Sequence, residues 1–343
     1  MKNILIIKLR YLGDVLLATP VIGQLRHAFP QAKLTMLINR GTEDVVRRNQ
    51  SLDEVLVLER GGLASQAGFC LDLWRRGFDC VIDLTDGDRA AFLSWITRAP
   101  VRIGFNQEGR WRGIAYTTVA SEPGNVHRIE RDLSCLRELG LVPDRGLPVL
   151  SPAPEDEEAG HRILGESGVQ VGRAPLVMLQ PGARYWFKAW PVDRFVELAN
   201  RLSRSTGCQL LVGGGSDEKP LAEAIVSQAR GRVVELAGRT TVLQYAAILK
   251  QCALFVGNDS GAMHMAAAVG TPVIGLFGPS DPKAWGPRGK RVTAIYKGLD
   301  CRACFHPTCT RGELNCMKQI SVDEVYGAAL RVLQEDRTGA GWA

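Results

Sequence analysis

The sequence lacks long apolar runs, internal repeats and low-complexity tracts. No apolar run reaches the roughly 18–20 residues that span a bilayer, so we expect no membrane-spanning helix. The apolar run near the start, residues 4–7, is shorter than the core of a secretory signal, and we therefore expect a cytoplasmic protein. The 343 residues, 45% hydrophobic and 23% charged, are typical of a soluble globular protein with two domains.

Two further features are missing. No strand candidate is followed by a G-x-G-x-x-G fingerprint, which argues against a nicotinamide or flavin enzyme. The net charge is only +6, from 42 basic and 36 acidic residues, and does not require a nucleic-acid partner. The basic residues are nevertheless uneven, since seven arginines and three acids lie from Arg89 to Arg131. Guanidinium groups match carboxylate and phosphate oxygens, so this segment carries either a surface for an anionic substrate or solvated charges.

Both halves of the chain alternate short apolar runs with amphipathic stretches, which predicts parallel sheets covered by helices. The strand candidates are residues 3–8, 33–38, 54–58 and 79–84 in the first half and 176–180, 209–212, 233–236, 254–256 and 273–277 in the second. We expect the linker within residues 147–174, with a short helix near 156–166. Ligands bind at the carboxyl ends of parallel strands, so two such α/β domains predict a cleft between them.

The turn after the first strand candidate carries Gly13 and Asp14. Glycine allows a close backbone approach. A carboxylate at this position suits the N-terminus of a helix, so Asp14 is compatible with a helix cap. It is equally compatible with a general base placed at the cleft.

Three loops of the second half follow strand candidates and combine glycine with polar residues. Residues 180–191 hold Arg184 and Lys188; residues 212–218 hold three glycines; residues 256–266 hold small residues that open a helix, with His264 one turn later. Free N–H groups and the helix dipole attract anions, and Lys188 is placed to neutralise a diphosphate leaving group. Each loop taken alone is also compatible with an ordinary capping turn, because capping turns use the same residue types.

Four of the nine cysteines form a C-x2-C-x4-C-x6-C cluster: Cys301, Cys304, Cys309 and Cys316. Four thiolates within sixteen residues are compatible with structural zinc. Disulfides or free thiols that pack a loop remain open alternatives. The other five cysteines lie singly in or beside apolar segments, which predicts core positions for Cys70, Cys80, Cys135, Cys208 and Cys252.

Three segments closely resemble the lipopolysaccharide heptosyltransferases of glycosyltransferase family 9, and most of all the heptosyltransferase III type. They are residues 8–14, the loop Pro181-Gly182-Ala183-Arg184 with Lys188-Ala189-Trp190-Pro191, and Asp259-Ser260-Gly261 with His264. Their order and spacing match the family from residue 1 to about 330.

The resemblance implies an α/β GT-B fold, with two Rossmann-like, doubly wound domains facing a central cleft. Residues 1–155 would form an acceptor-binding domain, residues 170–320 an ADP-heptose-binding domain, and residues 321–337 a helix that crosses back to the first domain. The implied reaction is inverting, metal-independent transfer of heptose from ADP-heptose to the inner-core heptose/Kdo region of lipopolysaccharide. No cofactor is implied for catalysis; zinc would be structural.

The resemblance also assigns site residues. Asp14 matches the family's general base, and Lys188 matches the lysine on the donor phosphates. The expected donor-binding residues are Gly13, Arg184, Lys188, Glu218, Thr240, Thr241, Asp259, Ser260, Gly261, Ala262 and His264. The expected acceptor-binding residues are Arg10, Arg60, Arg98, Arg110 and Arg112.

The implied partners are ADP-heptose, the lipid A–core acceptor and the cytoplasmic face of the inner membrane, by peripheral contact; nucleic acid is not expected. Two other functions are compatible with the sequence. One is a GT-B transferase or epimerase that uses another sugar nucleotide. The other is a non-catalytic protein that binds a sugar nucleotide, which the presence of both Asp14 and Lys188 argues against.

Overall fold

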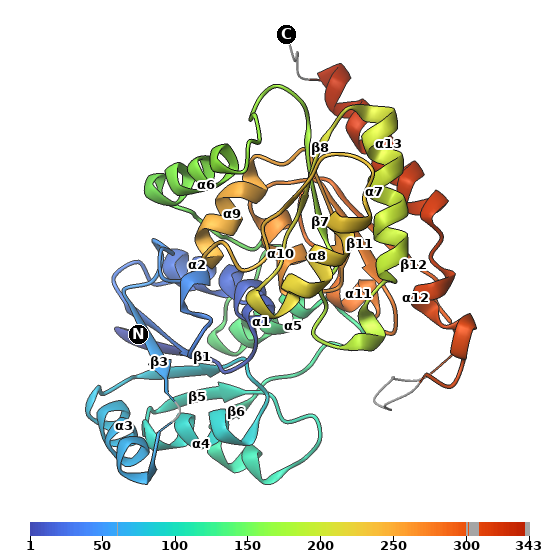
Figure 1. Cartoon of the computed structure of the whole chain (residues 1–343). Helices are drawn as coiled ribbons and strands as arrows, with labels where there is room; N and C mark the ends of the chain where they lie inside the picture. Colours follow the sequence, from blue (N-terminus) through green and yellow to red (C-terminus); the bar gives the residue numbers. More distant parts are fainter. Residues whose placement is uncertain (60, 300, 302–308, 340–343) are drawn as a thin grey trace. The chain divides into compact units, whose positions relative to one another are not determined.

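The computed structural model describes residues 1–59, 61–299, 301 and 309–339. The chain divides into two units, Met1–Leu150 and Ser151–Ala343 (Figure 1). Each unit holds a six-stranded sheet in which all paired strands are parallel. The predicted α/β class with two parallel sheets is therefore confirmed.

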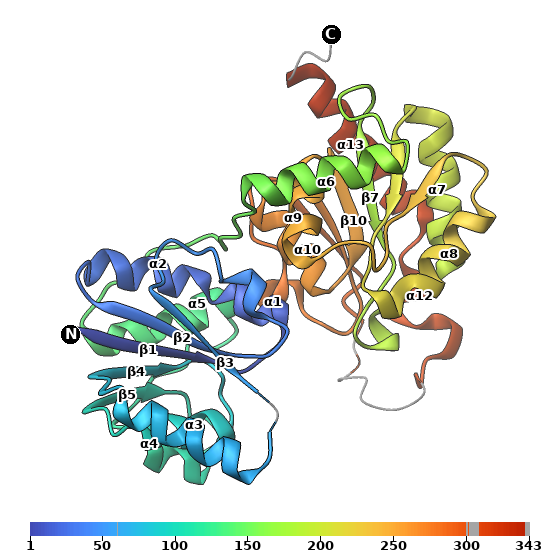
Figure 2. The same ribbon diagram turned by 60° about the vertical axis from the view of Figure 1, so that its left-hand side comes forward.

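The sheet of the first unit has the strand order β3-β2-β1-β4-β5-β6. Its strands are β1 Asn3–Lys8, β2 Lys33–Asn39, β3 Glu54–Leu58, β4 Cys80–Asp83, β5 Val101–Gly104 and β6 Thr118–Val119. Its helices are α1 Leu12–Leu17, α2 Thr19–Ala28, α3 Leu63–Arg75, α4 Asp88–Ile96 and α5 Arg128–Ser134. Helices α3 and α4 cover one face of the sheet, and α2 and α5 cover the other (Figure 2).

The sheet of the second unit has the strand order β12-β11-β10-β7-β8-β9. Its strands are β7 Leu176–Gln180, β8 Gln209–Val212, β9 Val233–Glu235, β10 Leu254–Asn258, β11 Val273–Phe277 and β12 Val292–Tyr296. Its helices are α6 Pro154–Glu166, α7 Val192–Thr206, α8 Lys219–Gln228, α9 Val242–Lys250, α10 Gly261–Ala268, α11 Pro282–Trp285, α12 Cys316–Gln319 and α13 Val322–Gly339. The central strands β7, β10 and β11 are buried along their whole length, because helices cover both faces.

The structure differs from the prediction at several elements. Between β1 and β2 the chain forms two helices, α1 and α2, that meet at Ala18. Pro20 in the first turn of α2 has no N–H to donate to Leu16, and the Thr19 hydroxyl donates to the Leu16 carbonyl instead, at 2.7 Å. Strands β5, β6 and β12 were not predicted, since β5 and β6 are short and β12 is largely exposed.

The expected C-terminal helix is observed as α13. Its buried side chains, Val325 and Ala329 among them, belong to the hydrophobic core of the second unit, and the helix packs along α7. The helix is therefore part of the second unit, and its return to the first domain stays a prediction. Within the described residues, no helix has both the length and the apolar character needed to cross a membrane.

Candidate functional site

The turn that follows β1 is fixed to the end of β4. Lys8 is buried, and its ammonium group donates to Asp132 Oδ2 at 2.5 Å and to the Leu84 carbonyl at 3.0 Å. The Leu9 amide donates to the Thr85 hydroxyl at 2.8 Å. These bonds hold the turn in place, so the residues at the carboxyl end of β1 have defined positions.

Asp14 lies on α1, directly after this turn. The helix begins at Leu12 and Tyr11 is its N-cap residue, so Asp14 is in the first turn and is not the cap. Its carboxylate interacts electrostatically with Arg128, at the start of α5. Burial and the neighbouring Arg131 lower the pKa of Arg128, and the carboxylates of Asp132 and Asp14 oppose this. Sequence reasoning placed Arg128 in the arginine-rich segment but did not select it as a site residue.

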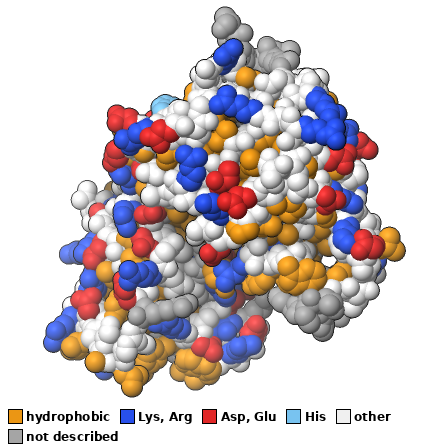
Figure 3. Space-filling model, in the orientation of Figure 1, with side chains coloured by type: hydrophobic (Ala, Val, Ile, Leu, Met, Phe, Trp, Pro, Cys, Tyr) orange, Lys and Arg blue, Asp and Glu red, His pale blue; other side chains and the backbone are white. Residues whose placement is uncertain are grey.

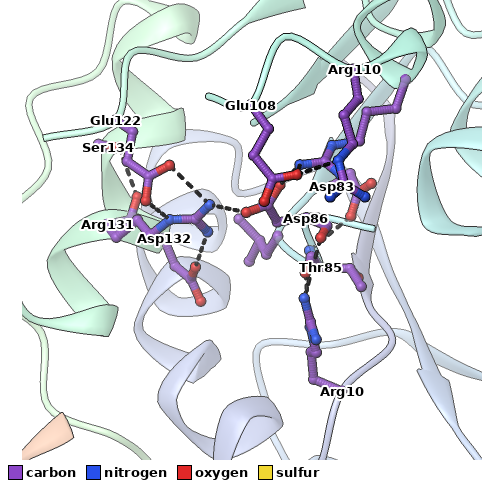
Figure 4. Close-up of polar contacts among 12 residues, drawn as sticks. Arg10, Asp83, Thr85, Asp86, Glu108, Arg110, Glu122, Arg131, Asp132 and Ser134 are labelled. Carbon is purple, nitrogen blue, oxygen red and sulfur yellow. Dashed lines mark hydrogen bonds and ion pairs between the residues drawn. The ribbon is translucent and has the colours of Figure 1, made fainter. Parts of the chain in front are cut away.

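A cluster of buried ion pairs lies beside the turn (Figure 4). Asp86 accepts from Arg112 and from Arg131, each at 2.7 Å, and Arg131 also pairs with Glu122. Both guanidinium groups are only about 3% exposed, and that of Arg131 also lies 3.7 Å from the ring centroid of Phe105. These two arginines therefore bind acids of the protein itself.

The five arginines expected to bind the acceptor have different surroundings. Arg10 donates to the carbonyls of Thr85 and Asp86, at 2.9 and 3.2 Å, and Arg112 is buried in the cluster just described. Arg110 is exposed and pairs with Glu108, which also contacts Arg112 at 3.6 Å. Arg98 is exposed after α4, and Arg60 lies outside the described residues. Three of the five are thus linked through Asp86 and Glu108, and the burial of Arg112 makes it a structural residue.

Asp83, at the end of β4, is a buried acid that the sequence did not single out. Its carboxylate accepts a hydrogen bond from the Tyr116 hydroxyl at 2.7 Å and another from the Thr85 amide at 2.8 Å. Burial raises the pKa of Asp83 to about 6, although these two hydrogen bonds lower it. Its signal in the sequence was an acid that ends an apolar strand.

In the second unit, Lys188 and Asp259 meet. Lys188 comes from a 3-10 turn, Trp186–Lys188, after β7, and Asp259 follows the adjacent strand β10. The Lys188 ammonium lies 2.6 Å from Asp259 Oδ2, which also accepts from the Ser280 hydroxyl at 2.5 Å. The two residues were predicted separately, and the structure brings them together at the carboxyl ends of neighbouring strands.

Helix α10 begins directly after Asp259. Ser260 is its N-cap residue, but the Ser260 side chain makes no capping bond. The Ser260 hydroxyl is buried and has no hydrogen-bond partner among the described residues. His264 is buried one turn into the helix. An N-terminus with unsatisfied N–H groups and a buried hydroxyl is suited to phosphate oxygens.

Glu218 is held on the other side of β7. Its Oε2 accepts from Gln180 Nε2 and from the Gly215 amide, each at 2.9 Å, and Gln180 in turn accepts from the Tyr245 hydroxyl at 2.6 Å. A Cβ at Gly182 would lie 1.7 Å from Glu218 Oε1, so any larger residue here requires the Glu218 carboxylate to move. Gln180 and Tyr245 were missed by sequence reasoning, although a glutamine that ends the apolar strand β7 was a visible signal.

The remaining donor-site candidates are at the surface of the same unit. Thr241 caps α9, because its hydroxyl accepts from the Gln244 amide at 3.3 Å, and Thr240 precedes it. Arg184 is exposed, with its guanidinium 5.7 Å from the ring centroid of Tyr185. Thr240 and Thr241 thus lie at the start of α9, and Arg184 lies beside Tyr185 in the loop after β7.

The cysteine cluster is described only in part. Cys301 is exposed, Cys309 is half-buried and Cys316 is buried, whereas Cys304 lies outside the described residues. In the part of the chain that is described, no three candidate ligands gather at one point. Zinc at this cluster stays a prediction. The core positions expected for the other five cysteines are confirmed for the four that are buried: Cys80, Cys135, Cys208 and Cys252. The fifth, Cys70, is half-buried.

Comparisons with known proteins agree with this geometry. The family model for glycosyltransferase family 9 (heptosyltransferase) matches residues 69–315. The chain is 31% identical to lipopolysaccharide heptosyltransferase 3 of Escherichia coli strain K12, over 97% of this chain and 98% of that protein.

Two solved structures are also similar. A family 9 glycosyltransferase from Veillonella parvula has a TM-score of 0.86 and 23% identity, and covers 97% of both chains. The ADP-heptose lipopolysaccharide heptosyltransferase II of Escherichia coli has a TM-score of 0.80 and 21% identity, over 98% of this chain and 100% of that one. At these identities the likeness supports the fold, and it agrees with the expected GT-B class.

Proposed function

The chain belongs to glycosyltransferase family 9, the heptosyltransferases, and from that premise we propose that it transfers heptose from ADP-heptose to the inner core of lipopolysaccharide. The observation that carries the proposal is the Lys188–Asp259 pair, 2.6 Å apart, at the N-terminus of α10. A cation, an acid and open N–H groups at one point are what a sugar diphosphate requires.

The donor would use each of these groups differently. The diphosphate would take the N–H groups of Ser260, Gly261 and Ala262, the Ser260 hydroxyl and the ammonium of Lys188. Asp259 would accept a hydrogen bond from a heptose hydroxyl, and His264 would support the phosphate from within the helix. Charge that develops on the departing ADP is then met by Lys188 and the helix N-terminus, so no strong acid is needed.

The nucleoside would lie nearer Glu218. The carboxylate of Glu218 is oriented by Gln180 and by the Gly215 amide, which suits it to accept hydrogen bonds from the ribose hydroxyls. Thr240 and Thr241, ahead of α9, would lie near the adenine, and exposed Arg184 would approach a phosphate. Gly13 would allow the donor to approach the turn of the first unit closely.

Asp14 would act as the general base. It would remove the proton from the acceptor hydroxyl while that oxygen attacks the anomeric carbon and the bond to ADP breaks. A single displacement of this kind inverts the anomeric centre. Arg128, whose charge interacts with that of Asp14, would hold anionic groups of the acceptor, together with Arg10. A cytoplasmic site, with peripheral contact to the inner membrane, is part of the same proposal.

The experiment measures ADP binding by calorimetry and heptose transfer to truncated core acceptors by mass spectrometry. We expect Asp14→Asn to bind ADP normally and to lose transfer by about 10²–10⁴-fold. Asp193→Asn is the matched control, since Asp193 is also a first-turn carboxylate, on α7. Lys188→Met should weaken ADP binding as well as transfer.

Other results would support other functions. Preference for a UDP-sugar over ADP-heptose would favour a GT-B enzyme with another donor. Tight binding of ADP-heptose, without transfer to any core acceptor or to water, would favour a non-catalytic binding protein. Equal transfer by Asp14→Asn and Asp193→Asn would remove Asp14 from the mechanism.

A further inference from the structure

Helix α3 of the first unit leaves most of its apolar side chains in solvent. Leu73 is its one buried residue among the described side chains. Leu63, Leu71 and Trp74 are 89%, 43% and 44% exposed. With Ala67 they follow a spacing of three and four residues, so they form one stripe along the helix. A stripe of this kind normally faces a core or a partner.

Helix α4, beside α3 on the same face of the sheet, adds two aromatic rings (Figure 2). Phe92 and Trp95 are 44% and 56% exposed, and their ring centroids lie 6.3 Å apart. Together, Leu63, Leu71, Trp74, Phe92 and Trp95 make up what we call the α3–α4 face. Hydrophobic side chains gather along the edge of the molecule that these helices form (Figure 3).

A pocket of about 390 Å³ opens between α3, α4 and the end of β3. Phe69, Phe92, Leu58 and Leu93 form its apolar walls, and its charged lining residues are Glu59, Asp72 and Arg89. Of the five residues of the α3–α4 face, Phe92 lines this pocket, so the pocket adjoins the face at that ring. Single exposed hydrophobic residues are ordinary on a protein surface, but five large ones on two adjacent helices, two of them tryptophans, mark an interaction site.

The charges around this face are mainly basic. Arg75 follows Trp74, Arg89 lines the pocket, and Arg98 follows α4; all three are exposed. No ion pair within the described part of the chain involves any of the three, whereas the two acids that line the pocket are paired, Asp72 with Arg76 at 2.7 Å and Glu59 with Arg40. Apolar and aromatic residues with flanking arginines are the composition of a surface that enters the headgroup region of a bilayer.

We propose that the α3–α4 face docks on an anionic lipid surface, with Trp74, Phe92 and Trp95 at the level of the headgroups and Arg75, Arg89 and Arg98 on lipid phosphates. The inference rests on the proposed function only because that function gives a reason for membrane contact. What the inference adds is the set of residues that make this contact. Charge decides against a second copy of the chain. A symmetric dimer through this face would bring the three arginines toward their own equivalents, and like charges across an interface are costly.

The test is flotation of the full-length protein with vesicles of phosphatidylcholine, with and without phosphatidylglycerol. We expect binding that requires phosphatidylglycerol, weakens with salt, and shifts tryptophan emission to the blue. The double variant Trp74→Ser/Trp95→Ser should lose at least tenfold in affinity, because both indoles leave the interface. The matched control is Tyr296→Ser/Leu314→Ser, which removes two exposed apolar side chains of the second unit and should bind as the wild type does.

A second variant tests the electrostatic part. Each of Arg75→Ala, Arg89→Ala and Arg98→Ala should weaken binding by roughly fivefold, since one basic residue near an anionic surface is worth about that much. Far-ultraviolet circular dichroism establishes that the variants are folded. Wild-type affinity in the tryptophan variant overturns the proposal, as does a concentration-dependent dimer that the tryptophan variant abolishes.

The docking result is independent of the catalytic result. ADP binding and transfer to a delipidated acceptor should be the same in the wild type and in Trp74→Ser/Trp95→Ser, because neither residue belongs to the donor or base machinery. If the wild type binds anionic vesicles but transfers nothing, the proposed function fails and the docking face stands. If transfer is normal and vesicle binding is absent, the docking face fails alone.

Discussion

Lys8 and Asp132 form an ion pair of 2.5 Å in which both side chains are almost fully buried. The pair joins the carboxyl end of β1 to α5, and a third bond, from Lys8 to the Leu84 carbonyl, adds the end of β4. The turn that carries Arg10 and leads into α1, the helix of Asp14, follows Lys8. The position of the proposed base thus depends on a buried charge pair that touches no substrate.

Removal of either partner should be strongly destabilising, because the other charge loses its hydrogen-bonded partner in a buried position; Asp132 would keep only Arg131, at 3.8 Å. We expect Lys8→Met and Asp132→Leu each to lower the free energy of unfolding by about 3–5 kcal/mol, measured by urea denaturation. The double variant Lys8→Met/Asp132→Leu should lose less than the sum of the two. Strict additivity would mean that the two side chains do not interact energetically.

Asp83 should make stability depend on pH. Its pKa is about 6 in the folded protein against 3.8 for an unperturbed aspartate, so the folded state binds the proton more tightly. The stabilisation from protonated Asp83 is fully present below about pH 4 and is lost as the pH rises through 6, an effect of up to about 3 kcal/mol. We expect Asp83→Asn to remove this part of the pH dependence, measured as the difference between wild-type and variant unfolding free energies.

Tyr116→Phe serves as the control for the Asp83 prediction. The Tyr116 hydroxyl donates to Asp83 and so lowers its pKa. Without this bond the pKa of Asp83 should rise further, and the loss of stability should move to higher pH. A difference curve that is flat between pH 4 and 7 in both variants would show that Asp83 does not titrate in this range.

Gly182→Ala should disturb the proposed nucleoside site through Glu218. The added Cβ would lie 1.7 Å from Glu218 Oε1, so the carboxylate must leave Gln180 and the Gly215 amide. We expect a stability loss of about 1–3 kcal/mol and weaker ADP binding by calorimetry. Gly215→Ala is the matched control, because no atom lies within 4 Å of a Cβ there and the amide is retained. Equal behaviour of the two variants would contradict the packing argument.

Much of the fold could be predicted because apolar runs and the loops between them alternate regularly. The run from Ile4 to Ile7 reads as a buried strand and is one, and the loops after β7 and β10 were recognised from glycine beside polar residues. These loops, which follow the carboxyl ends of β7 and β10, contain Lys188 and Asp259. Their contact could not be read from the sequence, because it depends on β7 and β10 being neighbours in the sheet.

The arginine-rich segment was harder to interpret, since exposed and buried arginines look alike in a sequence. Arg112 and Arg131 are buried because Asp86 and Glu122 neutralise them, and these acids lie 26 and 9 residues away. Arg98 and Arg110, in contrast, are exposed. Composition predicted that the segment is basic, but only the tertiary contacts separate the arginines that build the fold from those available to a ligand.

The Lys188–Asp259 pair has one more consequence for the proposed donor mode. In the structure the charges of Lys188 and Asp259 compensate each other, so Lys188 is not an uncompensated cation. In the proposed mode, a diphosphate that takes Lys188 would leave Asp259 with the Ser280 hydroxyl alone, and a sugar hydroxyl would replace the lost donor. Recognition of the phosphate and of the sugar is then thermodynamically coupled. ADP without its sugar would break the pair and offer Asp259 no replacement donor. The proposed site would therefore bind ADP-heptose more tightly than ADP.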